Sequence, residues 1–238
     1  MTEHLSPRRR GSYGLDAPYG FFFLAGLAIL YLVLAIVTGR VLFWFPVAIV
    51  LALEAWHFDF TLRGKFVMWA EPLDQLKLRG DERILDLGCG RGAVLLMAAQ
   101  HLTTGRAVGV DLWKKTDQSG NSAEATQRNA VAEGVADRVE LHTGDLTTLP
   151  FEDDSFDVVL SSLAIHNISG DAGREKAIRE AVRVLRPGGR LVIADVKATG
   201  QYQAVVATLG MNDVAHRKLA WRYWPICLVT ATKPERRS

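Results

Sequence analysis

Hydrophobic and polar positions divide this sequence into two unlike parts. Residues 20–53 contain a single charged residue, Arg40, whereas the rest of the chain carries charges at an ordinary frequency. Within the apolar part, residues 20–37 would form a helix about 27 Å long, close to the ~30 Å hydrocarbon core of a bilayer. Residues 41–53 follow a short break and would span only about 20 Å as a helix. The pattern predicts a helix of membrane length followed by a shorter apolar helix.

Two membrane arrangements of these helices fit the pattern. One is a tight helical hairpin with both ends on the same side, and the other is a spanning helix followed by a helix in the membrane interface. A hairpin buried against a soluble domain is the alternative without a membrane. The length criterion favours membrane association. Aromatic residues near the ends of both runs are typical of membrane interfaces. These residues are Phe21, Phe22, Phe23, Phe43, Trp44 and Phe45.

Charges before the first apolar run indicate which side of the membrane the chain occupies. Arg8, Arg9 and Arg10 are expected in the cytoplasm by the positive-inside rule, and a hairpin would return the rest of the chain there. The segment after the hairpin is amphipathic and rich in aromatic residues, so we expect it to lie either on the membrane face or on the following domain. The expected parts are a cytoplasmic tail (1–19), a membrane hairpin (20–56), an amphipathic connector (57–79) and a globular domain (80–238).

After residue 80, short apolar runs alternate with stretches of helical periodicity. The alternation predicts an α/β fold, with a Rossmann-like, seven-stranded, mostly parallel sheet and helices on both faces. The expected strands are 83–87, 106–111, 139–145, 155–163 and 190–196, with a closing antiparallel pair at 218–223 and 226–232. The expected helices are 93–102, 122–134, 171–185 and 202–209.

Composition removes several classes of protein. Hydrophobic residues make up 49% of the chain, which excludes a disordered protein. The formal net charge is only +2, which argues against nucleic acid as a partner. The two cysteines, Cys89 and Cys227, cannot build a disulfide scaffold, and the cysteines and histidines show no zinc spacing, so no metal is expected.

The strongest chemical motif is ILDLGCGRG at residues 84–92. A strand runs into alternate glycines, which let the backbone approach a ligand closely, and a helix follows. Asp111 ends the next strand, where an acid can accept both hydroxyls of a ribose. The glycine spacing is G-x-G-x-G and Asp86 lies beside it. A carboxylate there would repel a pyrophosphate but suits an ammonium and a sulfonium, so the motif favours S-adenosylmethionine over NAD.

Five successive segments of the chain resemble the motifs of class I S-adenosylmethionine-dependent methyltransferases. They read ILDLGCGRG, GVD, TGD, SFDVVLSSLAIHNI and RVLRPGGRLVIADV. The sequence is most similar to the small-molecule branch that includes the ubiquinone/menaquinone and sterol C-methyltransferases. The resemblance covers about residues 63–234, so the hydrophobic N-terminal part lies outside it.

The resemblance implies a role for each matching position. Gly88, Gly90 and the Cys89 backbone would line the methionine and ribose portions of the cofactor, and Asp86 would hold the methionine end. Asp111 would bind the ribose hydroxyls. Leu112 would pack on the adenine, whose amino group would donate to Asp145 beside the Leu146 backbone. Ser161 or Ser162, at the end of the fourth strand, would lie near the transferred methyl group. Asp145 is also placed to cap its own turn, and Ser162 to pack at the strand end.

Two residues after the fourth strand are candidates for catalysis. His166 and Asn167 follow the carboxyl end of a strand, where ligands of such sheets bind. His166 is placed to act as a general base and Asn167 to orient the substrate, or both serve only to shape the loop. Residues 113–119 form either a lid, a contact with anionic lipid headgroups, or a solvated loop. Trp221, Tyr223 and Trp224 either line an apolar entrance or pack in the core.

These features together predict a membrane-associated methyltransferase. The expected acceptor is a small, lipophilic molecule, because the hairpin would keep the enzyme where such a molecule partitions. A membrane protein that binds S-adenosylmethionine as a sensor or assembly factor, without catalysis, is the alternative. An NAD-dependent dehydrogenase fits the glycine spacing poorly. Neither the acceptor atom nor the oligomeric state can be deduced from the sequence.

Overall fold

The central element of the structure is a seven-stranded sheet with strand order β3-β2-β1-β4-β5-β7-β6. This computed structural model describes residues 9–220 and 225–236. Strands β1 to β5 run parallel, whereas β7 pairs antiparallel with both β5 and β6. The strands are β1 (Arg83–Leu87), β2 (Arg106–Asp111), β3 (Val139–Thr143), β4 (Phe156–Ser162), β5 (Leu185–Asp195), β6 (Asn212–Ala220) and β7 (Ile226–Thr232). The fold predicted from the sequence is therefore confirmed.

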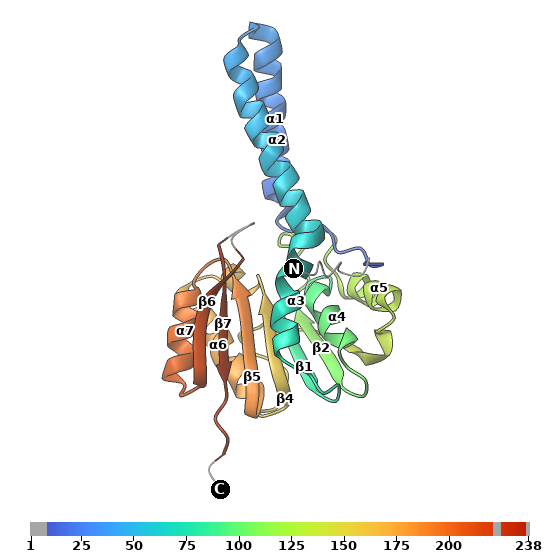
Figure 1. The fold of residues 1–238 in the computed structure, drawn as a ribbon, viewed down its shortest axis with the longest axis vertical. Coiled ribbons are helices and arrows are strands. Elements are labelled where there is room, and N and C mark those ends of the chain that lie inside the picture. Colours follow the sequence, from blue (N-terminus) through green and yellow to red (C-terminus); the bar gives the residue numbers. More distant parts are fainter. Residues whose placement is uncertain (1–8, 221–224, 237–238) are drawn as a thin grey trace, which may run out of the picture.

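Helices cover both faces of the sheet and enclose one apolar layer on each side (Figure 1). One layer contains residues of α3 (Lys65–Gln75), α4 (Ala93–Gln100) and α5 (Ala123–Glu133). The other contains residues of α6 (Asp171–Val184) and α7 (Thr199–Thr208). The central strand β1 is buried along almost its whole length, as expected for a parallel strand covered on both faces.

Some element boundaries differ from those predicted. The third strand ends at Thr143 rather than at residue 145, which leaves Asp145 in the loop that follows. Strand β5 begins at Leu185, because Leu185 already pairs with Phe156 of β4 before a register shift leads to the pairing of Arg190 with Val158. Strand β6 begins at Asn212, six residues earlier than predicted. The predicted continuation of that strand at residues 221–223 lies outside the described residues.

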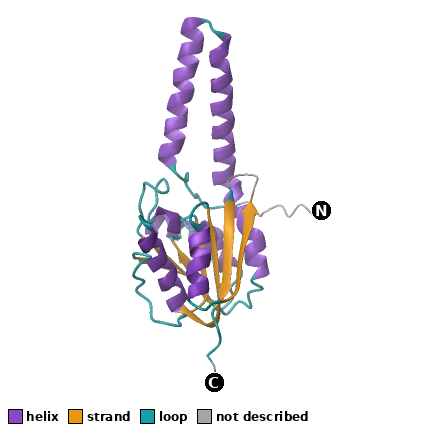
Figure 2. Cartoon of the chain, turned by 90° about the vertical axis from the view of Figure 1, so that its left-hand side faces the viewer, coloured by secondary structure: helices purple, strands orange, loops and turns teal. Residues whose placement is uncertain are grey.

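The N-terminal helices form an antiparallel hairpin that projects away from the sheet (Figures 1 and 2). Helix α1 (Pro18–Thr38) is followed by a 3₁₀ turn (Val41–Phe43) and by α2 (Trp44–Asp59). Helix α1 and the continuous helical segment Val41–Gln75, which contains α2, are each long and hydrophobic enough to cross a membrane by length and composition. Most of the large side chains of α1 and α2 face outward, as in Phe23 (71% exposed) and Ile49 (60% exposed). Of the arrangements considered above, the hairpin is the one that the structure adopts, and it is not packed into a soluble core.

The second hairpin helix continues directly into the globular domain. A π-helical segment (Phe60–Gly64) joins α2 to α3 without a break in the helix. The inner side of α3 is buried in the domain, with Trp69 at 0% and Leu73 at 1% exposure. One side of the expected amphipathic connector therefore packs on the domain, while Phe58, Leu62 and Val67 of the same segment remain exposed.

Residues 9–17, which we call the strap, run along the globular domain before the hairpin begins. The backbone N–H groups of Arg10 and Gly11 both donate to Glu133 Oε1, each over 3.0 Å. The backbone N–H of Ser12 donates to Asn129 Oδ1 over 2.8 Å. The described part of the expected N-terminal tail is thus bound to α5, whereas Arg8 lies outside the described residues.

Candidate functional site

The candidate site lies at the carboxyl ends of the parallel strands, on the side where the hairpin leaves the domain (Figure 1). The glycine-rich loop follows β1, Asp111 ends β2 and Asp195 ends β5. At the end of β4, Ser162 Oγ accepts a 2.8 Å hydrogen bond from Trp69 Nε1 of α3. This bond connects the helix that continues from the hairpin to the edge of the sheet where open α/β folds bind their ligands.

Two positions of the glycine-rich loop leave no room for a side chain. Gly88 has φ of +73°, and a Cβ added there would lie 2.3 Å from the Cβ of Ala164. Gly90 has φ of +51°, and its added Cβ would lie 2.7 Å from Gln118 Oε1. The N–H groups of Gly88 and Cys89 donate to Val110 O, which fixes the loop to β2. Both glycines are therefore required by conformation and by the lack of space.

Asp111 is held in one orientation by three donors of the protein itself. Its Oδ2 accepts from the Gly90 N–H over 2.9 Å. Its Oδ1 accepts from the Trp113 N–H over 2.5 Å and from Asn121 Nδ2 over 3.2 Å. The acid that ends β2 is thus fixed beside the glycine-rich loop, in the position that a ribose-binding acid requires.

Asp86 is a buried acid with an unsatisfied oxygen. The residue is 1% exposed, and its Oδ1 has no hydrogen-bond partner in the described part of the chain. Burial, and after it the charge of Asp111, raise the pKa of the Asp86 carboxyl to about 7. An unpaired carboxyl beside the glycine-rich loop is suited to a cationic ligand group, because such a group would supply the missing partner. The structure therefore fits a ligand that carries an ammonium group.

The residues expected around an adenine form an open, mixed surface. The Leu112 side chain is 45% exposed directly after Asp111, whereas Leu146 is buried. Asp145 is exposed and its Oδ1 accepts from the Thr147 N–H over 2.8 Å. This backbone bond is the main cause that lowers the pKa of the Asp145 carboxyl. Asp145 thus caps its own turn while remaining accessible to a ligand.

The hydroxyl groups of Ser161 and Ser162 are both engaged within the protein. Ser161 is buried and its Oγ donates to Leu87 O over 3.0 Å, which joins β4 to β1. Ser162 binds Trp69 as described above. Ser161 is thus placed as a link between strands, and Ser162 as a link between α3 and β4.

His166 has an acidic partner that the sequence analysis did not single out. Its Nδ1 lies 2.5 Å from Asp195 Oδ1, and its backbone N–H donates to Asp195 Oδ2 over 3.1 Å. Asp195 is 1% exposed and also accepts from the Val196 N–H (2.8 Å) and the Tyr202 hydroxyl (3.2 Å). The His166 side chain remains 20% exposed. The buried Asp195 carboxylate thus holds the His166 ring through Nδ1. The other ring nitrogen, Nε2, is hydrogen-bonded to none of the described residues.

Asn167 is brought to the same short 3₁₀ turn (Ile165–Asn167) but has a different environment. Its side chain is exposed and is hydrogen-bonded to none of the described residues. Trp221, Tyr223 and Trp224, expected near an entrance or in the core, lie outside the described residues. His166 and Asn167 therefore lie in the same turn, but only the His166 side chain is hydrogen-bonded to another described residue.

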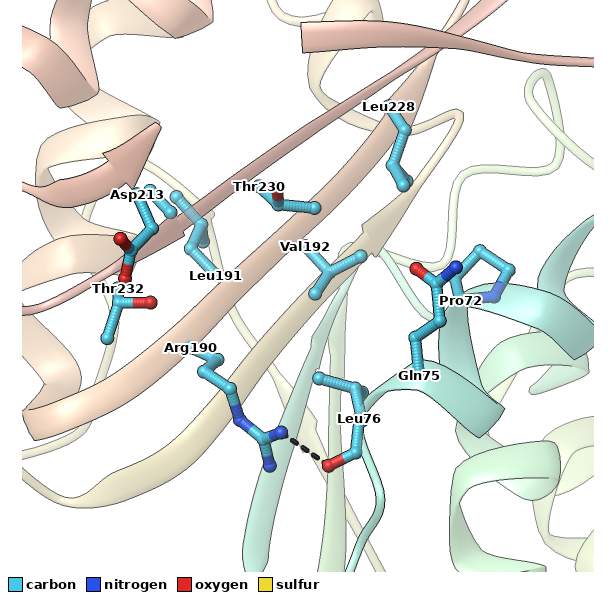
Figure 3. A pocket seen from close by; sticks show the side chains of 11 residues that line it. Pro72, Gln75, Leu76, Arg190, Leu191, Val192, Asp213, Leu228, Thr230 and Thr232 are labelled. Atoms are coloured by element: carbon cyan, nitrogen blue, oxygen red, sulfur yellow. Dashed lines mark hydrogen bonds between the residues drawn. The ribbon is translucent and has the colours of Figure 1, made fainter. Parts of the chain in front are cut away.

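A separate hollow of about 200 Å³ lies away from this site, between α3 and strands β5 and β7 (Figure 3). Pro72 and Gln75 of α3, with Leu76 directly after it, face Val192 and other residues of the sheet across the hollow. Arg190 donates to Leu76 O at its margin. Because none of the loops at the carboxyl edge lines this hollow, it is distinct from the candidate site.

Comparison with known proteins agrees with the residues at this edge. Residues 85–193 match the family model described as "Methyltransferase domain". Methyltransferase GfsG of Streptomyces halstedii is 35% identical over 142 residues, 60% of this chain and 48% of that protein. The ubiquinone/menaquinone biosynthesis C-methyltransferase UbiE of Roseobacter denitrificans is 33% identical over 129 residues, 54% of this chain and 48% of that protein. The chain thus spans about half the length of these curated relatives.

The fold is also similar to those of solved methyltransferase structures. The structure of geranyl diphosphate methyltransferase in complex with SAM superposes with a TM-score of 0.60 and 18% identity, covering 76% of this chain and 90% of that one. At this level of identity the likeness concerns the fold alone. With the family match, it confirms the resemblance that the sequence motifs indicated.

Proposed function

Because residues 85–193 form a domain of the S-adenosylmethionine-dependent methyltransferase family, we propose that the protein is a membrane-anchored methyltransferase acting on a small lipophilic acceptor. The observation that carries the proposal is the apolar hairpin, which leaves the domain on the side that holds the site and whose large side chains mostly face outward. A lipophilic acceptor partitions into the bilayer, so anchoring the enzyme there raises its local concentration. The arginines before α1 favour a cytoplasmic domain.

The proposed cofactor would be held by residues at the ends of β1 and β2. Asp86 would bind the ammonium of the methionine portion, Asp111 the ribose hydroxyls, and Leu112 the adenine face. S-adenosylmethionine supplies a methyl group already activated by the positive charge on sulfur. The protein's contribution is to align the acceptor with that methyl group and to exclude water.

His166 would accept the proton of the acceptor group as the new bond to carbon forms. Asp195 holds Nδ1, so Nε2 is the nitrogen left for the acceptor, and the buried carboxylate stabilises the imidazolium that results. A sensor without catalysis would not need this pair. The His166–Asp195 contact therefore favours the enzyme over the binding protein.

The proposal is tested by following methyl transfer from labelled S-adenosylmethionine. Full-length protein in lipid nanodiscs is expected to label a product that extracts into organic solvent when it is given a membrane lipid extract. Protein with His166→Ala, assayed beside it, provides the background. Labelling only of water-soluble acceptors would contradict the lipophilic acceptor, and labelling of no acceptor would favour the sensor.

Membrane anchoring leads to a prediction for charges placed on the hairpin. The double variant Ile29→Glu/Val33→Glu is expected to shift the protein from the membrane fraction toward the soluble fraction. Each buried charge costs about 2.5–3.5 kcal/mol at the centre of a spanning helix, and both side chains face outward, at 62% and 49% exposure. Val131→Glu, at a 64% exposed position of α5, is the matched control and should leave fractionation unchanged. Equal fractionation of the hairpin variant and the control would contradict anchoring by α1.

The glycine-rich loop leads to a second prediction. Gly88→Ala is expected to weaken binding of S-adenosylhomocysteine at least tenfold in calorimetry, because the new Cβ would displace Ala164 and the loop with it. Gly134→Ala is the control, since Gly134 has the same positive φ (+74°) but nothing within 4 Å of an added Cβ. It should lower stability by about 1 kcal/mol and leave binding intact. Equal binding by both variants would show that the loop does not approach the ligand.

A further inference from the structure

We propose that residues 113–119, which we call the collar loop, form a membrane-contacting surface that binds anionic phospholipid headgroups through Lys114 and Lys115. The inference rests on the membrane hairpin of the proposed function and adds a lipid partner that the hairpin alone does not specify. Three features of the collar loop support this inference: its level relative to the start of α1, its two lysines, and the hydrogen bonds that hold it.

Hydrogen bonds to the strap set the level of the collar loop relative to the start of α1. The N–H of Ala17 donates to Asp117 O over 3.1 Å, and Pro18 is the first residue of α1. Asp16 forms an antiparallel bridge with Gln118, and Leu15 exchanges hydrogen bonds with Ser119. The loop backbone is therefore joined to the residue that immediately precedes the membrane helix.

The first turns of α1 mark the level of the membrane interface. Tyr19 is 69% exposed and belongs to the aromatic type that concentrates at headgroup level. Phe22 and Phe23 follow it and are 64% and 71% exposed. The 21 residues of α1 extend about 31 Å, which matches one crossing of the hydrocarbon core. Since consecutive Cα atoms are about 3.8 Å apart, a loop bonded at Ala17 lies at the level of the headgroups.

The collar loop carries two lysines that lie outside the ion pairs of the described residues. Lys114 and Lys115 are exposed, and neither forms an ion pair with a described residue. Asp117 is the one acid in residues 113–119. The nearest acid of the strap, Asp16, is paired with Lys65 at 3.0 Å. The loop therefore presents two lysines that form no ion pair with a described residue, although the charge of Lys114, after the Thr147 N–H, contributes to lowering the pKa of the Asp145 carboxyl.

The frame that carries these lysines is rigid. Trp113 adopts φ of +58°, and its indole N–H donates to Thr143 Oγ1 over 2.8 Å. Lys114 O accepts from the Asp117 N–H (3.3 Å) and from Asn121 Nδ2 (3.5 Å). Gln118 is bound on both sides, by Asp16 and by the Arg91 N–H. A loop held at so many points presents its cations to the bilayer with little loss of entropy on binding.

The direct test is lysine acetylation of the full-length protein in nanodiscs, followed by peptide mass spectrometry. In discs of phosphatidylcholine with 30% phosphatidylglycerol, Lys114 and Lys115 are expected to react about fivefold more slowly than in phosphatidylcholine alone, the effect of about one headgroup contact per lysine. Raising the salt to 0.5 M should remove the difference, because screening weakens such contacts. Lys77, exposed at the opposite edge of the sheet, is the internal control and should react equally in both discs.

A competition between vesicles provides the second measurement. Wild-type protein is expected to prefer vesicles with 30% phosphatidylglycerol over neutral ones, and Lys114→Gln/Lys115→Gln should lower that preference about fivefold or more. Lys77→Gln/Arg179→Gln removes the same charge far from the hairpin and should retain the preference. Equal acetylation in the two discs, or equal preference of both double variants, would overturn the proposal. Failure of the protein to co-elute with the discs would instead contradict the membrane hairpin itself.

Discussion

His166→Ala is expected to lower the rate of methyl transfer by about 100- to 10,000-fold, with little change in the affinity for S-adenosylmethionine. The reason is geometric. His166 follows β4 at the edge where the acceptor must approach, and its Nδ1 is occupied by Asp195 Oδ1 at 2.5 Å. Among the described residues, the His166 side chain bonds to Asp195 and not to the glycine-rich loop or Asp111, so we expect its removal to affect proton transfer rather than binding of the methyl donor.

Asp195→Asn tests whether the carboxylate sets the orientation and tautomer of His166. An amide in its place can still pack there but cannot accept from both the imidazole and the backbone donors, so we expect a rate loss of about 10- to 100-fold. Tyr202→Phe is the matched control. It removes one 3.2 Å bond to the same carboxylate and leaves the His166 contact in place, so it should change the rate only slightly.

Chemical rescue separates a base from a structural histidine. Imidazole added to the His166→Ala protein is expected to restore part of the rate and to leave Asp195→Asn unchanged, since only the first variant has a cavity where the base was. Rates are measured by single turnover with saturating labelled cofactor, beside calorimetry of cofactor binding. A His166→Ala protein with wild-type turnover would show that the acceptor needs no proton removed.

The fold could be predicted from local patterns because each element shows its own periodicity. Short apolar runs ending in glycine or aspartate mark β1 and β2, and a helical stripe marks α6. The glycine-rich loop could be assigned on the same basis, since conformation alone demands glycine at Gly88 and Gly90. Element ends were less certain because strand pairing, rather than propensity, determines where β5 and β6 begin.

The features that could not be predicted all depend on contacts between distant residues. The strap is polar and short, and bonds to distant residues order it, among them Glu133, Asn129 and Ser119. Asp195 lies one residue before the end of the strand predicted over residues 190–196, but its pairing with His166 joins positions 29 residues apart. Trp69 binds Ser162 across 93 residues. Such pairs become visible only once the sheet has brought the strand ends together.

Cofactor affinity is expected to rise with pH up to about 7 and to become constant above it, and Asp86→Asn is expected to abolish this dependence. Burial and the nearby Asp111 raise the pKa of the Asp86 carboxyl to about 7 in the free protein. The charged carboxylate is the form that would hold the ammonium of the ligand. Below pH 7 a proton must be released on binding, so the affinity falls by up to about tenfold for each pH unit.

Asp86→Asn should weaken cofactor binding but stabilise the ligand-free protein. An aspartate whose pKa is raised on folding destabilises the folded protein as pH increases above its ordinary value near 3.8, and the loss is complete above about 7. At pH 8 the buried carboxylate therefore costs at most about 4 kcal/mol in the ligand-free protein. Asp86→Asn removes the charge, so we expect a higher melting temperature at pH 8 and little change at pH 4.

Binding is measured with S-adenosylhomocysteine, which carries the same ammonium, between pH 5.5 and 7.5. The upper limit avoids the titration of the ligand's own α-amino group near pH 8. Asp145→Asn is the control, because the carboxyl of Asp145 is exposed and its pKa is lowered by the Thr147 N–H, so it stays charged throughout this range. Wild-type affinity that does not vary with pH would show that Asp86 is not the group that binds the ammonium. If Asp86→Asn lowers the affinity for the ligand and also raises the melting temperature, the buried Asp86 carboxylate destabilises the ligand-free protein and binds the ammonium in the complex.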